Sequence, residues 1–112
     1  MKLLITTLPP GEPARAIARE LVQRGLAACA QLQPIESLYR WDGALQEDTE
    51  WRLLLKTSAA GLPALLDALR ALHPYDCPAL HTLSPDWTDP AFASWVSTCV
   101  TPPAPSTRRD PT

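Results

Sequence analysis

Prolines constrain the possible folds of this chain more than any other feature of its sequence. There are 13 prolines in the 112 residues, about 12% of the chain against a typical ~5%. Proline lacks a backbone N–H and has a fixed φ, so it belongs in the first turn of a helix or at the edge of a sheet, and not inside either element. Most of these prolines therefore mark the ends of short helices and strands. All four glycines also fall at such boundaries: Gly11, Gly25, Gly43 and Gly61.

Two long extended segments joined by a tight turn are the second strong signal. The turn is Asp42-Gly43, a pair that is typical of β-hairpins. We expect the strand before the turn to begin at Ala28 and the strand after it to end at Thr57, where apolar residues occupy every second position as they do in a half-buried strand. Pro34 interrupts the first of these strands, so it is expected at a bulge or at a sheet edge.

Shorter strands and three helices complete the expected order. Strands are predicted over residues 2–8 and 79–83, which are rich in apolar residues. Apolar side chains at spacings of three and four, each series opening near a proline, predict helices over 12–24, 61–73 and 90–99.

This order is β-α-β-β-α-β followed by a helix, and the right-handed crossover rule folds it into a ferredoxin-like sandwich. The expected fold is α+β, with a four-stranded antiparallel sheet, two helices on one face and a C-terminal helix. We expect this domain to cover residues 1–100, and 101–112, with four prolines, to be a disordered tail. The open sheet face must meet solvent, the last helix or another subunit, which predicts an oligomer.

Composition excludes several classes of function. The net charge is −2, which is too balanced for nucleic-acid or membrane-surface binding, and no apolar run approaches the ~18 residues of a membrane span. The N-terminus lacks the features of an export signal, and three cysteines argue against a disulfide framework, so a cytoplasmic location is expected. No phosphate-binding loop, organic-cofactor motif or nucleophile with an adjacent base is visible, so we expect no catalysis.

Soft metal ligands are concentrated near the end of the second helix. His73, Cys77 and His81 lie within nine residues, and a thiolate with imidazoles suits copper or zinc. The alternative is structural: His73 ends the helix, Tyr75 packs, and Cys77 is a small buried residue. Core packing is likewise the alternative to a metal role for a cysteine between alanines, Cys29.

Five segments together make this chain resemble the divalent-cation tolerance (CutA) family. They span residues 3 to about 98, and their order and spacing agree with the family pattern. The segments are LAACA at 26–30, SLYRWDG at 37–43, Glu50 with LLLKT at 53–57, HPY at 73–75 with Pro78, and PAFASW at 90–95.

The resemblance implies a homotrimer similar to the PII signalling proteins, without established catalysis, that is linked to tolerance of copper and other divalent metals. By position, Cys29 matches the cysteine of the family's Ala-Ala-Cys segment, and a metal site built on it is expected. The resemblance also implies an intersubunit pocket lined by Lys56, His73 and Tyr75, to which Trp41 is added. The family usually has Glu where this chain has Ala79. Without that carboxylate the pocket is expected to be more cationic.

Two hypotheses follow. In the first, the trimer binds copper or another divalent cation through Cys29, His73, Cys77 and His81. In the second, it is a PII-like module whose intersubunit clefts bind a small anionic metabolite or nucleotide through Lys56 and pass the state to an unknown protein partner.

Overall fold

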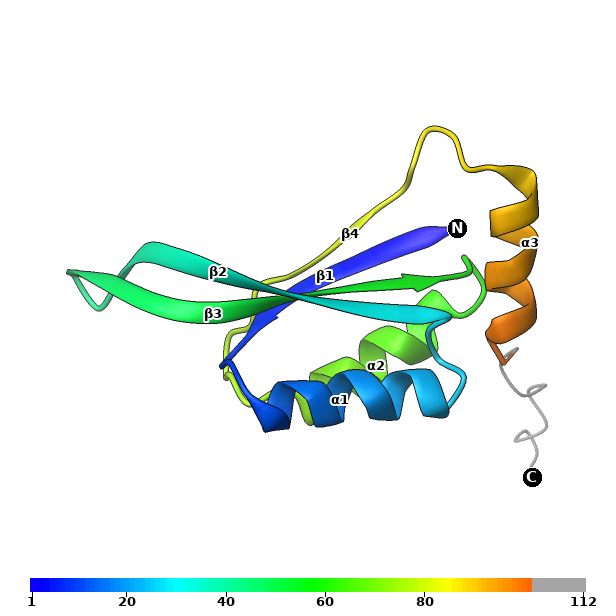
Figure 1. Cartoon of the computed structure of the whole chain (residues 1–112). Helices are drawn as coiled ribbons and strands as arrows, with labels where there is room; N and C mark the ends of the chain where they lie inside the picture. Colours follow the sequence, from blue (N-terminus) through cyan, green and yellow to red (C-terminus); the bar gives the residue numbers. More distant parts are fainter. Residues whose placement is uncertain (102–112) are drawn as a thin grey trace, which may run out of the picture.

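The computed structural model describes residues 1–101 and consists of a four-stranded sheet and three helices (Figure 1). In chain order, the elements are β1 (Lys2–Leu8), α1 (Glu12–Gln23), β2 (Cys29–Trp41), β3 (Ala44–Thr57), α2 (Leu62–Leu72), β4 (Leu80–Leu83) and α3 (Pro90–Cys99). Residues 102–112, which make up nearly all of the expected tail, lie outside the described part. No helix within the described part is long and apolar enough to cross a membrane.

The sheet is antiparallel with strand order β2-β3-β1-β4. Helices α1 and α2 lie side by side on one face of it, and α3 lies at the end of the sheet (Figure 1). This arrangement confirms the predicted α+β, ferredoxin-like sandwich. The face opposite α1 and α2 is called the open face below.

Alternation along the strands places one set of side chains in the core. Leu4 and Leu8 of β1 and Leu53 and Leu55 of β3 are fully buried, and paired positions in the register put them on the same face. They pack against the apolar stripes of α1 and α2. Three helical leucines complete this layer: Leu21, Leu65 and Leu69.

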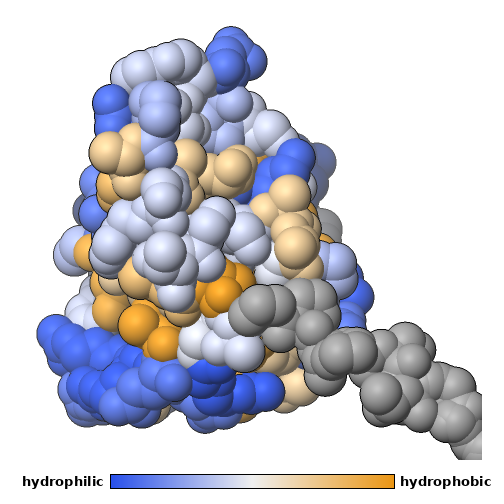
Figure 2. All heavy atoms as spheres, turned by 90° about the vertical axis from the view of Figure 1, so that its right-hand side faces the viewer, coloured by the Kyte–Doolittle hydropathy of each residue, from blue (hydrophilic) through white to orange (hydrophobic). Residues whose placement is uncertain are grey.

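The last helix closes a second, smaller cluster at the end of the sheet. Val96 and Val100 pack there with Ala28, and the backbone N–H of Thr101 donates to the Gly25 carbonyl at 2.8 Å. Figure 2 shows this end of the molecule, where apolar residues are bordered below by hydrophilic ones. Helix α3 is thereby fixed to the segment that follows α1.

Strands β2 and β3 extend well beyond the rest of the sheet. They pair with each other from Cys29↔Lys56 to Trp41↔Ala44, whereas β1 pairs with β3 only over residues 51–57. Residues 35–50 therefore form a two-stranded projection, here called the hairpin arm (Figure 1).

The hairpin turn and Pro34 both adopt positions that their residue types favour. Asp42 and Gly43 both have positive φ, 53° and 76°, which is the type I′ geometry that matches strand twist. Pro34 was expected at a bulge or at a sheet edge. It lies on the edge strand β2, and the register continues through it without a bulge.

Candidate functional site

His73 fastens the connection between α2 and β4 to the sheet. Its Nε2 lies 3.1 Å from the Thr7 carbonyl oxygen and 2.9 Å from Thr6 Oγ1, and its Nδ1 accepts from the Tyr75 backbone N–H at 3.1 Å. The Thr6 hydroxyl donates its own proton to the Ala79 carbonyl at 2.6 Å. This network assigns the proton of a neutral imidazole to Nε2, and it leaves no free ring nitrogen.

Burial lowers the pKa of His73, an effect that the Thr7 carbonyl and the charge of Glu50 oppose. The neutral ring is thus the form that the surroundings favour. A metal ion at Nδ1 would have to displace the Tyr75 N–H.

Tyr75 connects the same segment to the hairpin. Its hydroxyl donates to Glu50 Oε2 at 2.9 Å, and its ring lies 5.1 Å from the His73 ring between centroids. Burial, followed by the hydrogen bond to Glu50, raises the pKa of Tyr75 to about 12. The phenol therefore stays protonated and keeps donating throughout the physiological range.

A second tyrosine–carboxylate pair lies on the hairpin arm. The Tyr39 hydroxyl donates to Asp48, and this hydrogen bond is the main reason why the pKa of Tyr39 is raised. Asp48 and Glu50 thus each accept a hydrogen bond from one of the two tyrosines of the chain.

The four expected metal ligands occupy separate places in one protomer. Cys29 begins β2 and His81 lies on β4, the two outer strands, which are three strand spacings or roughly 14 Å apart. Cys77 is exposed in the connection before β4, not buried as the structural alternative proposed. Within residues 1–101 no three His, Cys, Asp or Glu side chains are grouped as metal ligands would be.

The three expected pocket residues are also separated within a protomer. Lys56 pairs with Cys29 at the base of the hairpin, whereas Trp41 is paired with Ala44 at its tip, roughly 40 Å away along the strand. The Lys56 ammonium lies over the Phe92 ring of α3, 5.3 Å from its centroid. Such contact between a cation and an aromatic face is attractive.

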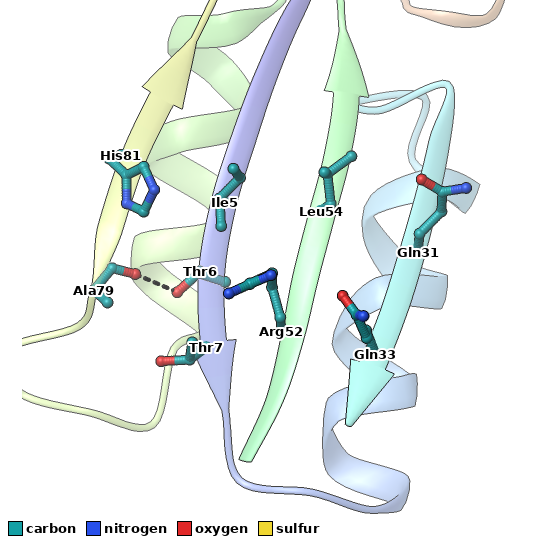
Figure 3. A pocket seen from close by; sticks show the side chains of 9 residues that line it. All are labelled: Ile5, Thr6, Thr7, Gln31, Gln33, Arg52, Leu54, Ala79 and His81. Atoms are coloured by element: carbon teal, nitrogen blue, oxygen red, sulfur yellow. Dashed lines mark hydrogen bonds between the residues drawn. The ribbon is translucent and has the colours of Figure 1, made fainter. Parts of the chain in front are cut away.

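A hollow of about 350 Å³ lies on the open face, and it is called the open-face hollow below (Figure 3). In Figure 3, Arg52 points from β3 toward β1, Gln33 points toward β3 from β2, and the His81 ring lies on the same side as Ile5. The lining residues are Ile5, Thr6, Thr7, Gln31, Gln33, Arg52, Leu54, Ala79 and His81.

Sequence reasoning missed three residues that organise these sites: Thr6, Glu50 as a hydrogen-bond acceptor, and Arg52. The signal for Arg52 was present, because it interrupts an apolar strand at a position that alternation places on the open face. For Thr6 and Glu50, the partners His73 and Tyr75 are distant in sequence, so only the fold brings them together.

The sheet topology and the hairpin arm place the chain among ferredoxin-like proteins with an extended hairpin. The model of the CutA1 divalent ion tolerance protein family matches residues 2–99, and the chain belongs to that family. The sequence is 38% identical over 96 residues to the divalent-cation tolerance protein CutA of Thermus thermophilus, covering 85% of this chain and 93% of that protein. A CutA homolog of Xenopus laevis is 40% identical over 95 residues, covering 84% of this chain.

The chain spans only 63% of the length of the Xenopus relative. Among solved structures, the PII-like protein CutA from Nostoc has a TM-score of 0.86 and 32% identity, covering 90% of this chain and 98% of that one. A protein from Archaeoglobus fulgidus, described as a periplasmic divalent cation tolerance protein, has a TM-score of 0.84 and 28% identity, covering 90% of this chain and 100% of that one. The family expectation from the five sequence segments is confirmed.

Proposed function

We propose that this protein confers tolerance to divalent metal ions as a non-catalytic homotrimer that binds copper at a subunit boundary. Membership of the divalent ion tolerance family supports the metal function. The observation that supports assembly is the hairpin arm, which no third strand flanks within the described residues.

The arm has the properties of a segment that needs a partner. An isolated two-stranded hairpin is marginally stable in water, and large apolar side chains on this one are exposed, including Leu38 at 63%, Trp41 at 61% and Leu45 at 68%. Covering the arms with neighbouring copies removes this apolar area from water. Assembly would also bring Trp41 of one protomer within the range of groups on another.

Cys29 is the cysteine whose position best suits a thiolate ligand at a boundary between subunits. It begins an edge strand at the base of the hairpin and is half-buried, and soft thiolate ligands select copper. Since no three such donors converge within residues 1–101 of one protomer, a copper site with three or more of these ligands would draw donors from more than one protomer. Cys77 is the exposed thiol among the three cysteines, and His81 is the exposed imidazole.

Calorimetric titration with copper tests this assignment. We expect Cys29→Ser to weaken binding at least tenfold and Cys77→Ser to have a smaller effect. Cys99→Ser is the matched control, because Cys99 packs in the α3 cluster. Unchanged copper affinity in both Cys29→Ser and Cys77→Ser would remove the thiolate site.

A second candidate function, an intersubunit site for a small anionic metabolite, is supported by Lys56. This ammonium has no carboxylate partner among residues 1–101, and Ala79 stands where the family pattern has a carboxylate. Nucleotide and organic-anion titrations of Lys56→Ala test it. Equal binding of every anion by this variant and the original chain would exclude Lys56 as the anion ligand.

We also propose a cytoplasmic location, which the unpaired cysteines support. Cell fractionation with antibodies to the full chain decides between the cytoplasm and the periplasm. The expected result is recovery with cytoplasmic markers.

A further inference from the structure

The hairpin arm is attached to the rest of the protomer at a short root, which consists of Glu50 and Trp51. The last residue pair between β1 and β3 is Leu8↔Trp51, so β1 ends beside Trp51 and leaves Glu50 unflanked on that side. Within residues 1–101, neither β1 nor β4 pairs with any residue of the arm. The direction of the arm therefore depends on what holds its root.

Two side chains hold the root from opposite faces. Glu50 and Trp51 are adjacent, so alternation directs them to opposite sides of β3. The Trp51 ring packs against the core and lies under the Arg15 guanidinium, whose central carbon is 4.7 Å from the ring centroid. Glu50 accepts from the Tyr75 hydroxyl at 2.9 Å. Bending of the arm toward either face therefore requires one of these contacts to open.

Tyr75 is itself fixed to a central strand of the sheet. Its backbone N–H donates to His73 Nδ1 at 3.1 Å, and His73 Nε2 lies 3.1 Å from the carbonyl oxygen of Thr7 on β1. The rings of Tyr75 and His73 lie 5.1 Å apart between centroids. The phenol therefore places Glu50 relative to β1, a strand with which the arm does not pair.

A small change of direction at the root becomes a large displacement at the tip. Glu50 and Ala44 are six positions apart on β3, which is about 20 Å of strand, so a rotation of about 10° moves the tip by about 3.5 Å. The exposed apolar residues of the arm lie along this length: Leu38, Trp41 and Leu45. Closely packed apolar contacts do not tolerate a displacement of that size.

We propose that the Tyr75–Glu50 hydrogen bond sets the direction of the hairpin arm and thereby controls how tightly copies of the chain associate. Tyr75 is a positioning residue in this role, because it acts on assembly through Glu50 at the root of the arm. The inference rests on the homotrimer proposed above, and it assigns to this pair a role that is separate from metal binding.

The mass of the folded chains over a dilution series tests the proposal, measured by sedimentation in urea below the unfolding transition. Tyr75→Phe keeps the ring and removes the donor, and Glu50→Ala removes the acceptor. We expect each to raise the concentration at which the trimer dissociates at least tenfold. The double variant should be no weaker than the weaker single variant, because both changes remove the same bond. Glu50→Gln retains an acceptor oxygen and should restore most of the assembly.

Tyr39→Phe is the matched control. The Tyr39 hydroxyl also donates to a carboxylate, that of Asp48, but both residues lie within the arm, so this bond does not connect the arm to the rest of the protomer. This variant should dissociate at the same concentration as the original chain. Circular dichroism verifies that the dissociated chains are folded. A purely structural role for Tyr75 would lower the unfolding temperature and leave the mass of the folded chains unchanged.

Three outcomes contradict the proposal, and they differ in what they leave standing. If Tyr75→Phe dissociates at the same concentration as the original chain, the homotrimer stands and the role of Tyr75 is overturned. Equal weakening by Tyr39→Phe also overturns that role, because the loss of either phenol would then suffice. A mass of one chain for the original protein at every concentration contradicts the homotrimer itself, and this inference with it.

Discussion

At the scale of single residues, His73 makes stability depend on pH. Its pKa lies below the ordinary value of 6.5, so below that pH the unfolded chain takes up a proton more readily than the native one. The stabilisation is complete above pH 6.5 and is lost as the pH falls through the native pKa. The neutral ring is what keeps the Tyr75 N–H bonded to Nδ1.

We therefore expect the urea midpoint to fall between pH 7.5 and pH 5.5, and this fall to be smaller in His73→Gln, which has no titrating ring. The variant should also lose about 1–3 kcal/mol at pH 7.5, because Thr6 and the Thr7 carbonyl lose a buried partner. Equilibrium unfolding at both pH values measures these quantities. An identical pH dependence in the two proteins would assign the effect to other groups.

Tyr75 allows its hydrogen bond to be measured directly. The chain has only two tyrosines, so Tyr39→Phe leaves a single phenol. Its absorbance should titrate with a pKa of about 12, and Glu50→Gln in the same background should lower this value because the charged acceptor is lost. A midpoint near 10 in the Tyr39→Phe protein would mean that neither the burial of Tyr75 nor its bond to Glu50 persists in solution.

At the scale of elements, two glycines have the same backbone conformation but different surroundings. Gly25, after α1, has φ +72°, and a Cβ there would overlap Thr101 Oγ1. Gly43, in the hairpin turn, has φ +76°, and nothing lies within 4 Å of its Cβ position. Comparing alanine variants at the two positions therefore distinguishes the cost of backbone strain, which both share, from the cost of a steric clash, which only Gly25 has.

Gly43→Ala should cost about 1 kcal/mol through the left-handed conformation alone. Gly25→Ala should cost clearly more, because it also displaces Thr101 and weakens the bond from its N–H to the Gly25 carbonyl. Urea denaturation of both variants gives the comparison. Equal losses would show that Thr101 adjusts freely.

Most of the elements were predictable because their signals are local. Pro13, Pro63 and Pro90 lie in the first turns of the three helices, and Asp42-Gly43 forms the expected turn. Each of these signals depends on a few adjacent residues.

The sites were less predictable because their contacts join distant segments. His73 bonds to β1, 66 and 67 residues away, and the hollow draws lining residues from all four strands. Residue type drew attention to His73 and the family resemblance to Tyr75, but neither could show that both nitrogens of the imidazole are occupied.

At the scale of the whole molecule, assembly is the main prediction. Three chains of 12.3 kDa give a mass of about 37 kDa (3 × 12.3), which light scattering measures. We expect Leu38→Lys with Leu45→Lys to shift this mass toward one chain, because both side chains are exposed on the arm. Thr49→Lys, also exposed on the arm, controls for the added charge. A mass of 12.3 kDa for the original chain would contradict assembly.

The different pairing of the two halves of the hairpin has a further consequence. Within β3, the buried residues Leu53, Leu55 and Thr57 all lie in the half that pairs with β1, whereas the arm contributes none to the core. Under the proposed assembly, changes in residues 35–49 are therefore expected to alter which copies associate and to leave the core of each protomer intact. Glu50 is different, because it accepts the Tyr75 hydroxyl proton within the protomer. If the chain assembles as proposed, one half of β3 contributes to the core of the protomer and the other half to contacts between copies, and the two halves can be changed separately.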